Sequence, residues 1–154
     1  MKAIVGELKS VIHSYAKKLG DLSEEDFSAM PGHGKWSKKE ELGHLLDSAH
    51  TNLRRFVVAQ YESEPKIVYE QELWVQKCAY QQQPTAPIIS FWILLNEQIC
   101  SVLASMPVEM QERLCDTGKH KKELHPLSWL AQDYVKHILH HLHHILELEP
   151  VPYG

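Results

Sequence analysis

Apolar residues recur at every third or fourth position in the first part of the chain, which is the period of one face of an α-helix. The first of these stripes ends at Gly20, a residue that commonly terminates helices. The second begins after Ser37 and Glu40, whose spacing is that of a capping box, and continues to about Gln60. The pattern therefore predicts two long amphipathic helices, with one helical turn expected between them at residues 21–27.

The second half of the chain predicts two more long helices. One begins near Thr85 and ends before Pro107. Apolar residues surround most of it, so we expect it deep in the core or at an interface. The last helix begins after Pro126 and continues to about Glu149, and a short helix is expected within residues 71–80.

No segment shows the alternation of apolar and polar residues that is typical of a strand. The charged segment from Val108 to Leu124, which contains Gly118, is predicted to be a long connection. Four long helices and an extra short one predict an all-α fold, a single-domain four-helix bundle over residues 1–154. Because two of the three connections between the long helices are long, a simple up-down-up-down order is not assumed.

Composition narrows the class of protein. The 154 residues, 44% hydrophobic and 23% charged, are typical of one globular domain. The net charge of −4 argues against binding to nucleic acid, and three cysteines are too few for a disulfide framework or a cysteine-based zinc site. The longest apolar stretch, Ile88 to Leu95, is too short to span a membrane, and no secretory signal is visible, so we expect a cytoplasmic protein.

Five of the eleven histidines lie between positions 137 and 144. Two pairs have the i,i+4 spacing with which one helix face can hold a metal ion, His137 with His141 and His140 with His144. On a helical wheel, His141 lies roughly 70° and His137 roughly 110° from the centre of the apolar stripe. His140 lies almost opposite that stripe, where solvent is expected. We therefore predict that His137 and His141 lie at the edge of the core and form a ligand pair.

The second long helix offers two candidates for a third ligand, His44 and His50. On the wheel, His50 flanks the leucine stripe, whereas His44 projects to the opposite side together with Asp47. Periodicity alone favours His50, or leaves His44 as an exposed polar residue. The residues by themselves therefore leave the third ligand open.

Two segments of the chain resemble the DinB/YfiT-like superfamily: K-W-S-K-K-E-E-L-G-H-L-L-D-S at residues 35–48 and D-Y-V-x-H-x-x-H-H at residues 133–141. With the flanking helices, the resemblance covers nearly the whole chain. It implies a four-helix bundle with up-down-down-up order, in which three histidines hold one divalent metal ion, zinc or nickel. Carried onto the matching positions, these ligands are His44, His137 and His141.

A metal site with three histidine ligands is suited to catalysis. Three neutral imidazoles leave a divalent ion with an open position, as in catalytic sites. That position can lower the pKa of a bound water or stabilise a substrate thiolate. Asp47, just after His44, and Asp133, one turn before His137, are available to orient the imidazoles. The resemblance implies a small-molecule substrate and either hydrolysis or transfer of a low-molecular-weight thiol.

Other functions are weighed against this one. A non-catalytic metal-binding or stress-response bundle is the alternative. A ferritin-like di-metal site needs two Glu-x-x-His motifs, of which Glu41 and His44 supply one and the histidine helix none. Hydrolysis by a serine or cysteine nucleophile has no support, since the chain contains neither G-x-S-x-G nor a recognisable cysteine motif.

The third long helix also bears on whether the protein forms a homodimer. Five consecutive apolar residues run from Phe91 to Leu95, and part of this run must face outward in a four-helix bundle. Exposed apolar patches are uncommon on soluble monomers. We expect either a cover formed by residues 71–80 and 108–124 or a homodimer, and the homodimer is favoured.

Overall fold

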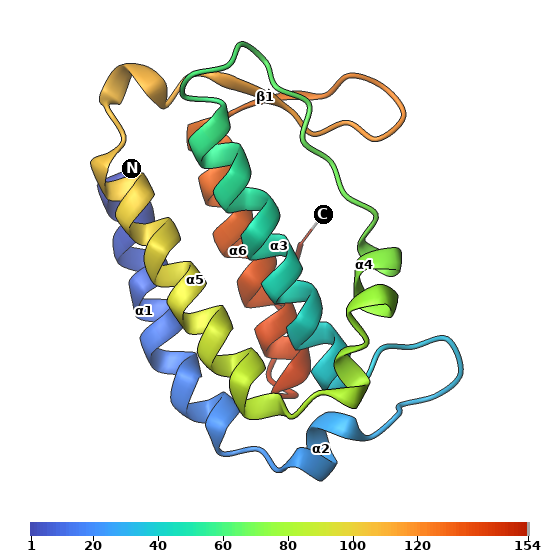
Figure 1. The fold of residues 1–154 in the computed structure, drawn as a ribbon. Coiled ribbons are helices and arrows are strands. Elements are labelled where there is room, and N and C mark those ends of the chain that lie inside the picture. The colour runs from blue at the N-terminus through green and yellow to red at the C-terminus, as the bar shows by residue number, and fades with distance from the viewer. Residues whose placement is uncertain (154) are drawn as a thin grey trace.

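A computed structural model describes residues 1–153 and shows a bundle of four long helices (Figure 1). Two of them run in one direction and two in the other, which is the up-down-down-up order that the resemblance implied. The all-α four-helix bundle predicted from the sequence is therefore confirmed. The long helices are α1 (Lys2–Gly20), α3 (Lys38–Val58), α5 (Thr85–Ser105) and α6 (Leu127–Ile145).

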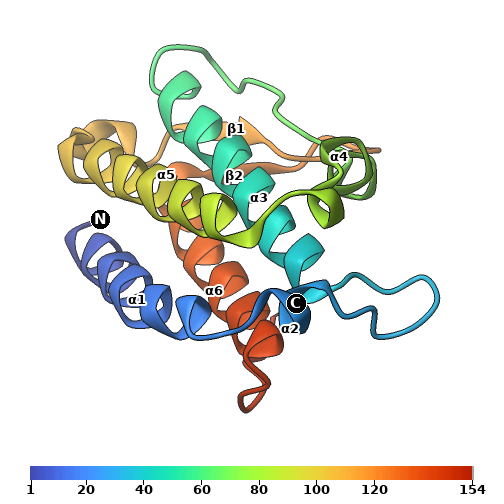
Figure 2. The ribbon, with the colours of Figure 1, turned by 60° about the horizontal axis from the view of Figure 1, so that its bottom comes forward.

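The order of the helices in space explains the long connections. Helix α5 packs between α1 and α3, and α6 packs against α1 and α3 on the other side (Figure 2). Because α3 and α5 are parallel neighbours, the chain must return along the bundle between them. This return contains the predicted short helix, α4 (Gln71–Cys78), and a 3₁₀ turn, η1 (Tyr80–Gln82). Both lie against α3.

Helix ends follow the capping rules. Ser37 accepts a hydrogen bond from the Glu40 amide (3.1 Å), and the Glu40 carboxylate accepts one from the Ser37 amide (2.9 Å), so the predicted capping box is present. The expected single turn is α2 (Glu24–Ser28). Helix α6 ends at Ile145, short of the predicted end near Glu149, because the backbone becomes left-handed at Glu147 (φ 54°) before the first proline.

A short hairpin occupies the connection that was predicted to lack strands. Its strands, β1 (Leu114–Asp116) and β2 (Leu124–Pro126), are antiparallel. The Asp116 carboxylate accepts the backbone amides of Gly118 (3.0 Å) and Glu123 (2.9 Å), which closes the loop between them. Three residues per strand are too few to show alternation, so the prediction of no strand was wrong here for lack of signal.

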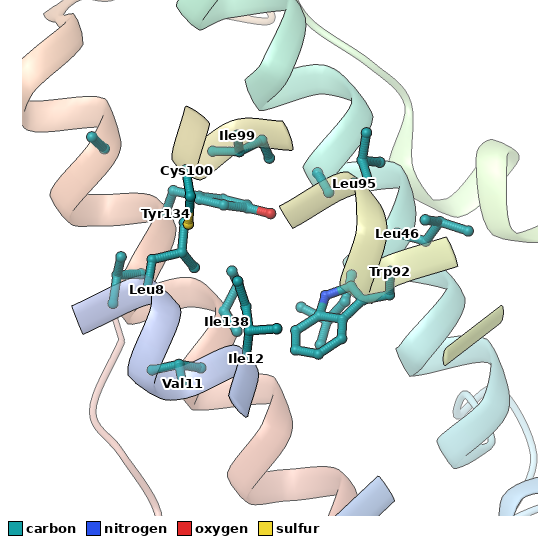
Figure 3. Packing of buried hydrophobic residues seen from close by; sticks show 14 of the residues in the cluster. Leu8, Val11, Ile12, Leu46, Trp92, Leu95, Ile99, Cys100, Tyr134 and Ile138 are labelled. Carbon is teal, nitrogen blue, oxygen red and sulfur yellow. The ribbon is translucent and has the colours of Figure 1, made fainter. Parts of the chain in front are cut away.

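The core fills the space between the four helices (Figure 3). Trp92 of α5 and Tyr134 of α6 are its largest side chains, and both are fully buried. The Tyr134 hydroxyl donates to the Asn96 side-chain oxygen (2.7 Å), so a polar group in the core is satisfied. Apolar side chains from all four long helices surround them, among them Leu8, Val11, Ile12, Leu46, Leu95, Ile99, Cys100 and Ile138.

Helix α5 is long and apolar enough, by length and composition alone, to cross a membrane. In the bundle one of its faces lies in the core, as Trp92 shows. Its outer face leaves Phe91 and Leu94 exposed, Leu94 by 62%. Helix α4 packs on α3, and the exposure of Phe91 and Leu94 shows that the cover weighed for this face does not reach these two residues. The homodimer stays a prediction.

Two glycines in helices give a matched test of the packing. A Cβ on Gly43 of α3 would lie 2.1 Å from the Tyr80 ring, whereas one on Gly6 of α1 would meet no atom within 4 Å. Gly43→Ala should lower the free energy of unfolding by about 1–3 kcal/mol, because the ring must move. Gly6→Ala should raise it by up to about 1 kcal/mol, because alanine favours helix. Urea titration measures both, and a stabilising Gly43→Ala would contradict the packing described.

Candidate metal centre

Three histidines meet where α3 and α6 pack against each other. His44 comes from α3, and His137 and His141 come from successive turns of α6. The Nε2 atoms of His44 and His137 are 3.1 Å apart, and one nitrogen of each ring lies within 4.8 Å of the others. The ring centroid of His141 lies 4.8 Å from that of His44 and 4.6 Å from that of His137. The structure therefore brings together the three residues that the resemblance indicated.

His50, the alternative third ligand, lies elsewhere. Its Nδ1 is bonded to the Leu46 carbonyl (3.1 Å), and its ring meets the edge of Phe91 on α5 at 5.2 Å. The helical wheel favoured His50 because it assumed that only the apolar stripe of α3 is buried. In the bundle every residue from Glu41 to Ala49 is buried, so the polar side of α3 also faces protein.

Burial keeps two of the imidazoles neutral, those of His44 and His137. Burial first, and the neighbouring imidazoles second, lower the pKa of His44 to about 4 and that of His137 to about 2. Neutral rings offer lone pairs to a cation at neutral pH. The Nδ1 of His44 is buried and has no hydrogen-bond partner within the described residues. Three convergent imidazole nitrogens are a donor set that fits a divalent metal ion.

Glu41 connects two histidines of α6 to α3. Its carboxylate accepts from Nδ1 of His141 (2.7 Å) and from Nδ1 of His144 (2.6 Å). Burial alone would raise the pKa of Glu41, but the two hydrogen bonds outweigh it and the pKa is lowered. Because a carboxylate only accepts, His141 carries its proton on Nδ1 and keeps Nε2 free for a metal.

The sequence analysis does not predict that Glu41 orients His141. It treats Glu41 and His44 only as one of the two Glu-x-x-His motifs of a di-metal site. The signal lay in the spacing itself, which puts a carboxylate one turn before a ligand on the same helix. The partner was not predictable, since it required knowing that α6 lies antiparallel beside α3.

The two aspartates considered for orienting the ligands have different surroundings. Asp47 is buried, and its Oδ1 accepts from the Tyr80 hydroxyl (2.5 Å). Its Oδ2, like Nδ1 of His44 one turn earlier, is buried without a partner among the described residues. Asp133 instead accepts from the Tyr153 hydroxyl (3.0 Å), and the Tyr153 ring contacts His137 at 5.3 Å between centroids. Asp133 is therefore connected to His137 through Tyr153.

The other histidines of α6 have partners outside the cluster. His140 was expected in solvent, but the C-terminal segment covers it, and its Nδ1 is bonded to the Val151 carbonyl (2.9 Å). His143 lies between the Tyr15 hydroxyl (2.6 Å) and the Glu149 carbonyl (2.7 Å). The wheel could not foresee this cover, because it comes from residues beyond the helix.

A cavity of about 350 Å³ opens beside the three histidines. Its walls are mostly polar, and they come from α3 and the loop before it, from α4 and the connection before it, from α6 and from the C-terminal segment. Besides the histidines they include Trp36, Ser48, Asn52, Arg55, Tyr69, Asp133 and Tyr153. The arrangement suits a small polar molecule that reaches the histidine nitrogens.

Comparison with known proteins agrees with this geometry. A family model described as the DinB superfamily matches residues 7–145. The chain belongs to the DinB superfamily. A protein of Bacillus cereus (strain G9842) named "putative metal-dependent hydrolase" is 24% identical over 148 residues, which are 94% of this chain and 82% of that protein.

A solved structure of the same kind is YfiT from Bacillus subtilis. It is described as "a probable metal-dependent hydrolase with an unusual four-helix bundle topology". It matches with a TM-score of 0.84 at 20% identity, covering 95% of this chain and 83% of its own. This likeness confirms the predicted fold of the DinB-superfamily chain.

Metal content tests the three histidines directly. Replacing His44, His137 or His141 by Ala should reduce bound metal from about one ion per chain to near zero, whereas His50→Ala should leave it unchanged. Glu41→Gln should weaken affinity by about 10- to 100-fold, because the orientation of His141 is lost. Elemental analysis and competition with a chelator on untagged protein measure both. Loss of metal in His50→Ala, with retention in His44→Ala, would contradict the assignment.

Asp47 makes the free energy of unfolding depend on pH in a direction that its surroundings determine. Burial raises the pKa of Asp47 from 3.8 to about 6, so the folded state keeps a proton that the unfolded state releases between these pH values. The contribution of Asp47 to stability therefore falls as the pH rises from about 4 to 6. In metal-free protein, Asp47→Asn should raise the free energy of unfolding more at pH 7.5 than at pH 4. Urea titration with a chelator present checks this, and an equal effect at both pH values would contradict it.

Proposed function

We propose that the chain is a metal-dependent hydrolase of small molecules, in which His44, His137 and His141 hold one divalent ion. The observation that carries the proposal is the convergence of three imidazoles on the wall of a polar cavity. The names of the Bacillus cereus and Bacillus subtilis relatives support the same reaction class.

Zinc or nickel suits the proposed site, since imidazole nitrogen is a favoured donor for both. When bound by three neutral histidines, such an ion supplies a Lewis acid and a water molecule of lowered pKa. The chain's part is to hold the ligands in place. Glu41 fixes His141, and the Ser48 hydroxyl lies 3.4 Å from Nδ1 of His137, where it can accept the ring proton.

Other cavity residues are placed to bind and polarise a substrate. Burial raises the pKa of Tyr69 to about 12, so its hydroxyl stays protonated and can donate to an oxygen that gains charge. The Trp36 ring lies 5.1 Å from the His44 ring, and Tyr153 covers His137. These two aromatic side chains flank the histidines at the cavity wall.

Transfer of a small thiol is the second candidate reaction. None of the three cysteines, Cys78, Cys100 and Cys115, lines the cavity, so a reacting thiol would have to be a second substrate. A non-catalytic metal-binding bundle is the remaining alternative. Hydrolysis needs only water as the second reactant, and thiol transfer needs an added thiol. A non-catalytic bundle shows no turnover with either.

An activity screen separates them. Untagged, metal-loaded protein is assayed with small amides, esters and phosphoesters, and then with electrophiles plus a small thiol. We expect hydrolysis without a thiol, loss of activity on chelation and in His137→Ala, and full activity in His50→Ala. Product formed only when a thiol is added would identify a transferase, and turnover that survives chelation would contradict the proposal.

A further inference from the structure

Arg55 places a positive charge in the same cavity as the three histidines. His44, Ser48, Asn52 and Arg55 follow one another at intervals of four, four and three residues, so they share one face of α3. The backbone rise from His44 to Arg55 is about 16 Å. Helical side chains lean toward the helix N-terminus, so the long Arg55 side chain is directed back toward His44. The cavity thus has imidazoles at one end and a guanidinium at the other.

The guanidinium lacks an ionic partner. Its three hydrogen bonds go to neutral oxygens: Nε and Nη2 donate to the Ile67 carbonyl (3.1 and 2.9 Å), and Nη1 donates to Asn52 Oδ1 (3.3 Å). Among residues 1–153, no carboxylate forms an ion pair with it. Asp133 lines the same cavity and its charge acts on Arg55 from a distance, but its carboxylate accepts from Tyr153 and forms no ion pair with Arg55. Arg55 is half-buried, and charges withdrawn from water are usually paired, so its lack of an ion pair in the cavity wall favours an anion at this position.

The guanidinium also retains donors for that anion. A guanidinium has five N–H bonds, two on each terminal nitrogen and one on Nε. Three are used by Ile67 and Asn52, which leaves one on Nη1 and one on Nη2. Two donors on adjacent nitrogens match the two oxygens of a carboxylate.

We propose that Arg55 binds a carboxylate of the substrate, so that the site acts on small carboxylate-bearing molecules. The inference rests on the proposed function for the reacting end, where the histidines lie. The volume of about 350 Å³ limits the substrate to a small molecule whose carboxylate lies several bonds from the group that reacts. Tyr69 and Ser48, between the two ends, can bond its polar atoms.

Binding of a simple anion tests this without turnover. Succinate and its uncharged diamide are titrated against metal-loaded protein by calorimetry, with inorganic phosphate as a third probe. Wild-type protein should bind succinate about 10- to 100-fold more tightly than the diamide, as expected for charge-assisted hydrogen bonds. The preference should weaken as salt is added. Phosphate bound more tightly than succinate would overturn the carboxylate assignment.

Arg113 offers a matched control for Arg55. It also donates to two backbone carbonyls, those of Ala59 (3.0 Å) and Glu62 (2.6 Å), but it does not line the cavity. Arg55→Gln should abolish the preference for succinate, and Arg113→Gln should keep it at a similar cost in stability. If Arg55→Gln does not fold, Arg55→Lys should still lose about tenfold in affinity, because lysine keeps the charge and loses the fork. An unchanged preference in the folded Arg55 variant would overturn the proposal.

A variant of the histidine cluster separates this proposal from the proposed hydrolase function. His137→Ala removes a ligand, so any preference for succinate that it retains comes from Arg55 and not from a metal ion. We expect His137→Ala to keep most of the preference. Retention there without any hydrolysis by wild-type protein would refute the function and support the anion site. Loss of the preference in His137→Ala, with retention in Arg55→Gln, would assign the anion to the metal and overturn the role of Arg55.

Discussion

The burial of a polar face on α3 is the constraint on which the rest of the structure depends. His44 and Asp47 are 2% and 1% exposed, and Glu41 and Ser48 are buried with them. Polar groups removed from water are costly unless they are bonded, so each needs a partner from another element. Glu41 finds two histidines of α6, Asp47 finds Tyr80, and His44 meets His137. Two atoms of this group, Nδ1 of His44 and Oδ2 of Asp47, find no hydrogen-bond partner within residues 1–153.

The topology supplies those partners. Because α3 and α5 run parallel, the chain returns along the outside of α3 and places Tyr69 and Tyr80 against its polar face. Because α6 runs antiparallel to α3, its histidines lie opposite the first turns of α3. The unusual order of the helices and the composition of the site are therefore two consequences of one arrangement. A simple up-and-down bundle would have no returning segment on this side of α3.

The sequence predicted the elements and part of the site. Helical periods and capping signals located all four long helices, α2 and α4, because these signals are local. The pair His137 and His141 followed from a wheel, since α6 has one clear apolar stripe. The helical wheel did not predict His44 as a ligand, because α3 is buried on its polar side as well. The assignment of His44 as the third ligand came from the resemblance to the DinB/YfiT-like superfamily. The covers of His140 and Asp133 come from the segment after α6, and Glu41 bonds across two helices, so no local pattern could predict them.

The central claim is that one divalent ion lies between His44, His137 and His141. The most direct measurement is the anomalous scattering from crystals of untagged protein, recorded on both sides of the absorption edge of the metal found by elemental analysis. The account predicts a single peak per chain, about 2.0–2.1 Å from one nitrogen of each of the three rings. A peak held by His140 or His144 instead, or a fully ordered histidine cluster with no peak in protein saturated with metal, would contradict it.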